Sequence, residues 1–167
     1  MTAPNLVAID ACILINFIRV GRLDLLINCP GIKFVITEEV LSELTDEGQR
    51  TEILAGIDGG QFERFAIQKL NTVERFADLA TVMGKGEASA IAAAESEGWF
   101  IATDEGSRAR RTINEGACAG RLMTTPGILL HLLKSNVLTI DDADAIKTEL
   151  EGHRFLMNFK SFRDLIK

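Results

Sequence analysis

Four acidic residues stand where an α/β chain would bring their side chains together. The four are Asp10 after the apolar run LVAI, Glu43 in TEEVLSEL, Glu87 in GKGEASA and Asp104 in FIATDE. Carboxylates gathered at one edge of a sheet repel each other unless a cation lies between them. Oxygen ligands of this kind are the ones that Mg²⁺ and similar hard cations prefer. The pattern therefore predicts a divalent-metal site.

The elements that must position these acids follow an α/β pattern. Strand-length apolar runs alternate with longer segments of helical period, which is typical of βα units on a parallel sheet. We expect strands at residues 6–9, 33–36, 99–103 and 121–124, with a weaker candidate at 62–67. Ligands and substrates of open parallel sheets gather outside the carboxyl ends of the strands. Asp10 and Asp104 directly follow two of these strands, so they form the firmest pair.

The sequence also predicts where helices begin and end. The expected signals are a break around Gly21 between ACILINFIRV and RLDLLIN, N-caps at Thr37, Asn71 and Asp141 or Asp142, a C-terminal Gly98, and a first-turn Pro126. Residues 1–167 are read as a single domain. Residues 153–167, which carry Phe155, Phe159 and Phe162, are expected to form a C-terminal helical extension that covers the core.

Each acid also has a plain structural reading. Asp10 could be only a helix N-cap, and Glu43 only a glutamate bordering an apolar helix face, with Glu39 as the fallback ligand on the same edge. Glu87 could be a first-turn acid, where the helix dipole favours its ionised form. Adjacent side chains seldom enter one pocket, so we prefer Asp104 as a ligand and keep Glu105 as the fallback.

The overall charge does not favour nucleic acid. The chain has 167 residues with 18 Lys+Arg against 24 Asp+Glu, a net charge of −6. Any RNA must then be held by a local basic patch and by metal that screens the acids. The candidates near the acidic blocks are Lys85, Arg108, Arg110 and Arg111. A solvated helix face explains the same basic residues.

Cysteine and histidine offer no obvious alternative chemistry. The three cysteines are widely spaced and lack a metal-binding pattern, so we expect free thiols in a reducing cytoplasm. The N-terminus lacks a signal peptide, and no run is long enough to span a membrane. The two histidines, His131 and His153, lie away from the acidic blocks. Without a His or Cys partner, the acids favour Mg²⁺ or Mn²⁺ over zinc.

Together the blocks resemble a PIN domain. The resemblance rests on VAIDACILINF and GRLDLLI, FVITEEVLSEL, GKGEASAIAAA, FIATDEGSRARR and GRLMTTPGILLHLLKSN, in that order over most of residues 5–150. It implies a three-layer α/β/α fold with about five parallel strands. It also implies an acidic quartet of Asp10, Glu43, Glu87 and Asp104, with Thr103 and Thr124 or Thr125 as polar neighbours.

The resemblance further implies a cytoplasmic, metal-dependent endoribonuclease that hydrolyses RNA phosphodiesters with metal-activated water. Such proteins include toxins held by an antitoxin protein, and many form homodimers. Two positions depart from the pattern. Ala11 and Cys12 stand where a small hydroxyl residue or asparagine often follows the first aspartate, and Glu105 stands where many relatives have aspartate.

Two other functions remain open at this point. A phosphatase of the haloacid dehalogenase type also has an aspartate after its first strand, but it needs a second aspartate where this chain has Cys12. A PIN-like domain without catalysis, acting as a protein- or RNA-binding module, would share the same acidic pocket.

Overall fold

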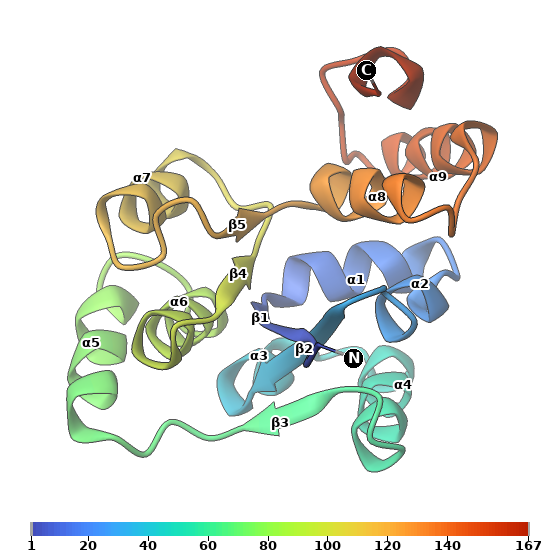
Figure 1. Cartoon of the computed structure of the whole chain (residues 1–167). Helices are drawn as coiled ribbons and strands as arrows, with labels where there is room; N and C mark the ends of the chain where they lie inside the picture. Colours follow the sequence, from blue (N-terminus) through green and yellow to red (C-terminus); the bar gives the residue numbers. More distant parts are fainter. Residues whose placement is uncertain (1, 167) are drawn as a thin grey trace.

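A sheet of five parallel strands forms the centre of the computed structural model, which describes residues 2–166 (Figure 1). The strands are β1 (Asn5–Ile9), β2 (Ile32–Thr37), β3 (Glu63–Phe65), β4 (Phe100–Ala102) and β5 (Leu122–Met123). Their order across the sheet is β3-β2-β1-β4-β5. All five predicted strands are confirmed, including the weaker one, and β5 has only two residues.

Helices connect and flank the strands. They are α1 (Ala11–Arg19), α2 (Leu23–Ile27), α3 (Glu38–Glu43), α4 (Glu47–Asp58), α5 (Leu70–Ala80), α6 (Lys85–Glu97), α7 (Ser107–Glu115), α8 (Thr125–Lys134) and α9 (Ile140–Gly152), with a 3₁₀ turn η1 (Phe162–Leu165). Connections between parallel strands are right-handed. The chain moves from β1 outward to β3 and then returns past β1 to β4 and β5. Helix α3 packs against α6 beside the sheet. The expected three-layer α/β/α fold with about five parallel strands is confirmed.

The reversal of chain direction lies between β1 and β4. Ile9 at the end of β1 pairs with Ala102 at the end of β4. Asp10 and Thr103 are therefore the first residues beyond the paired ends of two neighbouring strands. This is the switch point at which α/β sheets open a crevice for ligands. On one side of it lies α6, whose alanines Ala88, Ala90 and Ala92 are buried and allow it to pack closely on the sheet.

Four of the predicted helix signals are confirmed. The break around Gly21 lies between the end of α1 at Arg19 and the start of α2 at Leu23. Thr37 accepts a hydrogen bond from the Val40 backbone N–H and caps α3. Gly98 ends α6 in the left-handed conformation, with φ of 73°, which glycine adopts without a Cβ penalty. Pro126 lies in the first turn of α8.

Two predicted N-caps are wrong. Helix α5 begins at Leu70 after Lys69, so Asn71 lies inside its first turn. Helix α9 is capped by Thr139, and the Asp142 carboxylate accepts a hydrogen bond from the Thr139 backbone N–H. This capping box satisfies two N–H groups at once, which Asp141 or Asp142 alone as N-cap would not do.

The predicted C-terminal helix is largely absent from residues 153–166. Arg154 has a positive φ of 66°, which ends the helical path after α9. The tail is instead anchored by Asp144 of α9, whose carboxylate accepts hydrogen bonds from the Ser161 hydroxyl (2.6 Å) and the Phe162 backbone N–H (2.8 Å). Phe162 is completely buried. Figure 1 shows this tail beside α9, away from the sheet.

Helix α8 packs within the monomer. Its apolar residues Ile128, Leu129 and Leu132 have no exposed surface. His131 of the same helix shares a hydrogen bond with the Pro30 carbonyl oxygen, 2.8 Å from Nε2, and does not line the acidic cavity. Within the described residues, none of the helices is both long and apolar enough to traverse a bilayer.

Candidate metal centre

Asp10 is the buried acid at the centre of the site. Its carboxylate accepts from the Ala11 backbone N–H (2.8 Å), which caps α1, and from the Cys12 thiol and the Thr103 hydroxyl, both at 3.1 Å. The Asp10 carboxylate therefore caps α1 and also belongs to the site. Burial raises the pKa of Asp10 and Glu43 raises it further, while the three hydrogen bonds oppose the shift.

Glu43 reaches the site from the end of a short helix. It is the last residue of α3, not a residue well inside a longer helix as its sequence suggests. Its Oε1 accepts a hydrogen bond from the Gly86 backbone N–H at 2.7 Å. A Cβ at Gly86 would lie 2.3 Å from Glu43 Oε2. Only glycine at the start of α6 leaves room for this carboxylate.

Glu87, in the first turn of α6, carries an unsatisfied atom. Its Oε1 is buried and has no hydrogen-bond partner among the described residues. Burial, followed by the negative charges of Asp10, Glu105 and Glu43, raises its pKa to about 7. Without a cation, desolvation and three neighbouring carboxylates therefore outweigh the helix dipole, which favours the ionised form at this first-turn position.

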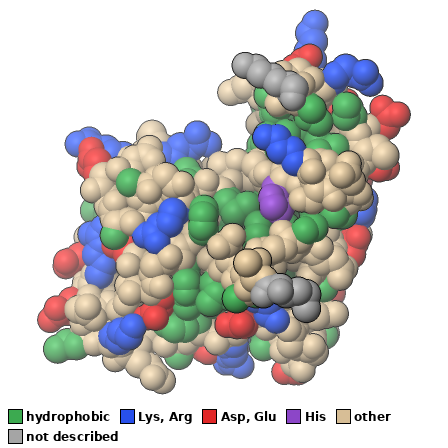
Figure 2. Space-filling view, viewed as in Figure 1, with side chains coloured by type: hydrophobic (Ala, Val, Ile, Leu, Met, Phe, Trp, Pro, Cys, Tyr) green, Lys and Arg blue, Asp and Glu red, His purple; other side chains and the backbone are tan. Residues whose placement is uncertain are grey.

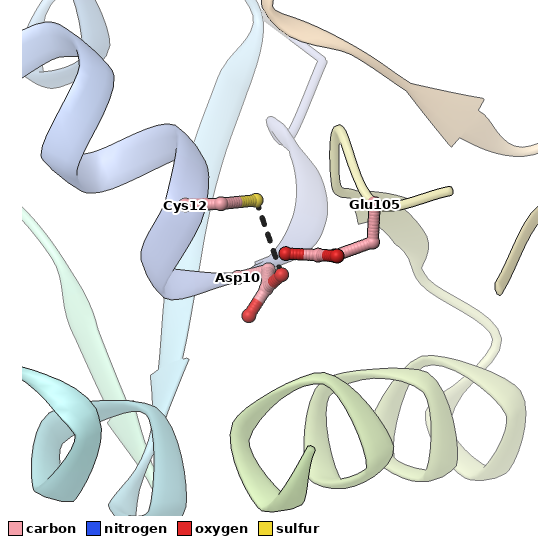
Figure 3. A group of neighbouring side chains, drawn as sticks. All are labelled: Asp10, Cys12 and Glu105. Carbon is pink, nitrogen blue, oxygen red and sulfur yellow. Dashed lines mark hydrogen bonds between the residues drawn. The ribbon is translucent and has the colours of Figure 1, made fainter. Parts of the chain in front are cut away.

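Asp104 and Glu105 take different directions after β4. The Asp104 carboxylate accepts from Asn16 Nδ2 (3.2 Å), from the Thr125 backbone N–H (2.7 Å) and from the Thr125 hydroxyl. Glu105, whose backbone N–H donates to Thr103 Oγ1 at 3.1 Å, turns its carboxylate toward Asp10. Figure 3 shows Asp10 and Glu105 facing one another beside Cys12. One ligand atom from each of these three residues lies within 4.8 Å of the others.

Most of the acidic side chains described above line one cavity of 390 Å³. It is lined by Asp10, Ala11, Cys12, Ile15, Glu43, Gly84, Glu87 and Glu105. Three members of the predicted quartet and the fallback Glu105 thus meet in one cavity. Asp104 does not line it, and neither does the fallback Glu39, whose Oε2 is buried without a partner elsewhere.

Cys12 is the member of this cavity that sequence reasoning missed. Its Sγ lies 3.1 Å from Asp10 Oδ2 and 3.8 Å from Thr103 Oγ1, and it accepts from the Asp104 backbone N–H at 3.5 Å. The reading that no cysteine partners the acids is therefore wrong. The available signal was its place in the first turn of the helix that Asp10 caps, where a side chain stays close to its cap.

The predicted RNA-binding residues surround the site without entering it. Arg108 donates to the Val82 carbonyl oxygen at 2.5 Å, and Arg111 pairs with Glu115 at 2.9 Å. The positive charge of Arg110 acts on the Asp104 pKa, and Lys85 is an exposed residue at the start of α6. Figure 2 shows Lys and Arg side chains on the side of the molecule where α7 lies. The predicted Thr103 is buried and orients Asp10.

A second hollow of 330 Å³ adjoins the acidic cavity. It shares Cys12, Ile15 and Glu105 with the cavity and is completed by Asn16, Arg19, Asp104, Gly106 and Phe155. The α1 residues in it follow the i, i+3, i+4, i+7 spacing of one helix face. Arg19 is exposed, and Phe155 comes from the C-terminal tail. The hollow therefore places the positive charge of Arg19 and the aromatic ring of Phe155 beside the acids.

The donor set suits a hard divalent cation. Within the described residues, the cavity lining has four carboxylates and no Lys, Arg or His side chain to balance them. The buried Glu87 Oε1 lacks the partner that a buried polar atom normally has. A cation in this cavity would balance the negative charge of the carboxylates, and contact with Glu87 would give Oε1 its missing partner.

Comparison with known proteins identifies the family to which the chain belongs. A family model described as PIN domain matches residues 6–167. One similar solved structure is VapBC2 from Rickettsia felis bound to a DNA fragment from their promoter, with 14% identity, a TM-score of 0.47, and coverage of 71% of this chain and 98% of that chain. The search of curated proteins found no match.

Proposed function

Because the chain belongs to the PIN domain family, we propose that it is a metal-dependent endoribonuclease that hydrolyses RNA phosphodiesters with Mg²⁺ or Mn²⁺. The observation that carries the proposal is the meeting of Asp10, Glu87 and Glu105 in one cavity, with Glu87 Oε1 buried and unpartnered. Their oxygens are the ligand type that both ions prefer.

In this proposal Asp10, Glu87 and Glu105 hold the ion. When bound, the ion would polarise the phosphate and lower the pKa of water. Asp10 is held in place for this role by the Cys12 thiol and the Thr103 hydroxyl. Asp104 is not a ligand in this proposal, because its own oxygens accept hydrogen bonds from Thr125 and Asn16. Its role is to support the neighbouring Glu105.

Glu43 and Glu87 are the candidates for proton transfer. Glu43 is fixed through Oε1 by the Gly86 backbone N–H, which leaves Oε2 free to accept a hydrogen bond from water. Glu87, with a pKa of about 7, has a carboxyl group that can hold or release a proton near neutral pH. Both carboxylates line the cavity that contains Asp10.

RNA would approach along the hollow beside the cavity. Arg19 would contact a phosphate and Phe155 would stack on a base, as basic and aromatic side chains do in single-strand grooves. Lys85, Arg108, Arg110 and Arg111 would add positive charge around the entrance, against the net charge of −6.

The proposal includes a role as the toxin of a toxin–antitoxin pair. The anionic cavity would accept a cationic side chain of an antitoxin protein in place of the metal. Under the alternative, a binding module without catalysis, the same cavity would serve only to hold a partner.

The decisive experiment compares wild type with Asp10→Asn on a mixed RNA pool in Mg²⁺, in Mn²⁺ and in excess chelator. Wild type should cleave only with metal, and the variant should not cleave. Asp46→Asn is the matched control, because Asp46 caps the exposed start of α4 and asparagine caps equally well.

Cleavage in chelator, or equal cleavage by wild type and Asp10→Asn, rejects the proposed site. A folded wild-type protein that binds neither Mg²⁺ nor Mn²⁺ favours the binding module. Copurification of a small partner that blocks cleavage supports the toxin role.

A further inference from the structure

We propose that the Cys12 thiol makes this cavity a binding site for a thiophilic divalent cation of the Zn²⁺ type, held by Cys12, Asp10 and Glu105, which competes with the Mg²⁺ or Mn²⁺ of the reaction. The inference rests on the proposed metal centre and assigns it a sulfur ligand and an inhibitory ion.

The geometry of the three ligand atoms carries the inference. Cys12 Sγ, Asp10 and Glu105 present one atom each within 4.8 Å of one another (Figure 3). Tetrahedral zinc with bonds of 2.0–2.3 Å needs ligand atoms about 3.3–3.8 Å apart. The Sγ to Asp10 Oδ2 distance of 3.1 Å is already close to that range. Glu105 is exposed and can make the remaining adjustment by side-chain rotation.

The surroundings of the thiol suit an ion that displaces its proton. Cys12 now donates its proton to Asp10 Oδ2. A bound thiophilic cation would displace this proton, because a coordinating thiol is deprotonated outright and its proton passes to solvent. The thiolate and the two carboxylates then surround the ion with three negative charges against its two positive charges.

The thiol also separates two classes of metal. Mg²⁺ requires octahedral oxygen ligands and leaves a thiol protonated, so Cys12 would keep its hydrogen bond to Asp10 when Mg²⁺ is bound. Thiolates select softer ions such as Zn²⁺. Since both ions use Asp10 and Glu105, only one can occupy the cavity at a time.

Cobalt is the spectroscopic probe for the test, because Co²⁺ bound to a thiolate shows a charge-transfer band in the near ultraviolet. We expect the band in wild type and its loss in Cys12→Ser, which keeps a hydroxyl donor to Asp10. Zn²⁺ affinity measured by calorimetry should fall about tenfold or more in that variant, while Mn²⁺ affinity changes less than about twofold. Cys29→Ala is the control, since Cys29 is buried outside the cavity.

A second measurement uses only wild-type protein. Zn²⁺ should slow alkylation of Cys12, read by mass spectrometry, and Mg²⁺ should not. A cobalt band that is missing in wild type or kept in Cys12→Ser, or equal alkylation with and without Zn²⁺, overturns the inference. RNA cleavage with Mn²⁺ but no Cys12-dependent Zn²⁺ binding rejects this inference alone. Cys12-dependent Zn²⁺ binding without RNA cleavage rejects the ribonuclease instead.

Discussion

Thr125 holds Asp104 through two groups at once. Its backbone N–H donates to Asp104 Oδ1 at 2.7 Å and its hydroxyl donates to Oδ2. Because Asn16 donates to Oδ2 as well, at 3.2 Å, the carboxylate joins the end of β4 to the start of α8 and to the middle of α1. The neighbouring Glu105 is left to line the acidic cavity. Under the proposed function, these two adjacent acids divide structural support and ion binding between them.

This division predicts that Asp104→Asn mainly lowers the stability of the protein, whereas Glu105→Gln mainly lowers its affinity for metal. The amide at 104 would set an NH₂ group against donors, and the free energy of unfolding in chelator should fall by about 1–3 kcal/mol. At the exposed position 105 the change should stay within about 0.5 kcal/mol, because no buried bond is lost. Urea unfolding measures both, and calorimetry with Mn²⁺ should show the larger loss of affinity for Glu105→Gln. Equal losses of stability and affinity in the two variants would contradict the division.

Gly86→Ala should impair cleavage without unfolding the protein. The added methyl group would lie 2.3 Å from Glu43 Oε2 and would push that carboxylate out of the cavity. Helix propensity favours alanine over glycine by about 1 kcal/mol, which offsets part of the strain. A misplaced group at this distance should lower the cleavage rate about 10- to 100-fold. Gly152→Ala is the control, since no atom lies within 4 Å of its added Cβ. Wild-type cleavage by Gly86→Ala would remove Glu43 from the mechanism.

Glu87 should make the metal-free protein less stable as the pH rises. Its folded pKa of about 7 lies above the ordinary 4.5, so the folded state binds more protons between these values and loses stability as pH increases through them. Glu87→Gln removes this loss. The melting temperature of the variant relative to wild type should therefore be higher at pH 8 than at pH 5, with chelator present.

Added metal should offset the destabilisation that the ionised Glu87 causes at high pH. Mn²⁺ at pH 8 should raise the melting temperature of wild type and have little effect on Glu87→Gln, because the ion neutralises the charge that the variant lacks. Glu52→Gln, at an exposed position of α4, serves as the control for the substitution itself. A pH response that is the same in wild type and Glu87→Gln would show that the buried carboxyl group is not the source.

The sequence was sufficient for the parts of the site that depend on local pattern. Asp10 directly follows an apolar strand, which was enough to place it at the carboxyl end of the sheet. The choice between Asp104 and Glu105 could not be made this way, because Thr125 and Asn16 lie 21 and 88 residues from Asp104 in the chain. The tail was mispredicted for a similar reason, since Asp144 anchors it through contacts that no local pattern reveals.

The hollow beside the cavity predicts how RNA is held. Arg19→Ala should weaken binding of a labelled single-stranded RNA to the Asp10→Asn protein, measured by fluorescence anisotropy. The slope of log affinity against log salt should fall by about 0.7, as for one lost phosphate contact on a single strand. Arg163→Ala is the control, because Arg163 is an exposed residue of the tail that does not line the hollow. Phe155→Ala should cost about 1–3 kcal/mol of binding with an unchanged salt slope, and Phe155→Trp should restore it, because stacking is not ionic. If Arg19→Ala and Arg163→Ala bind alike, RNA does not follow this groove and must enter from the side of α7.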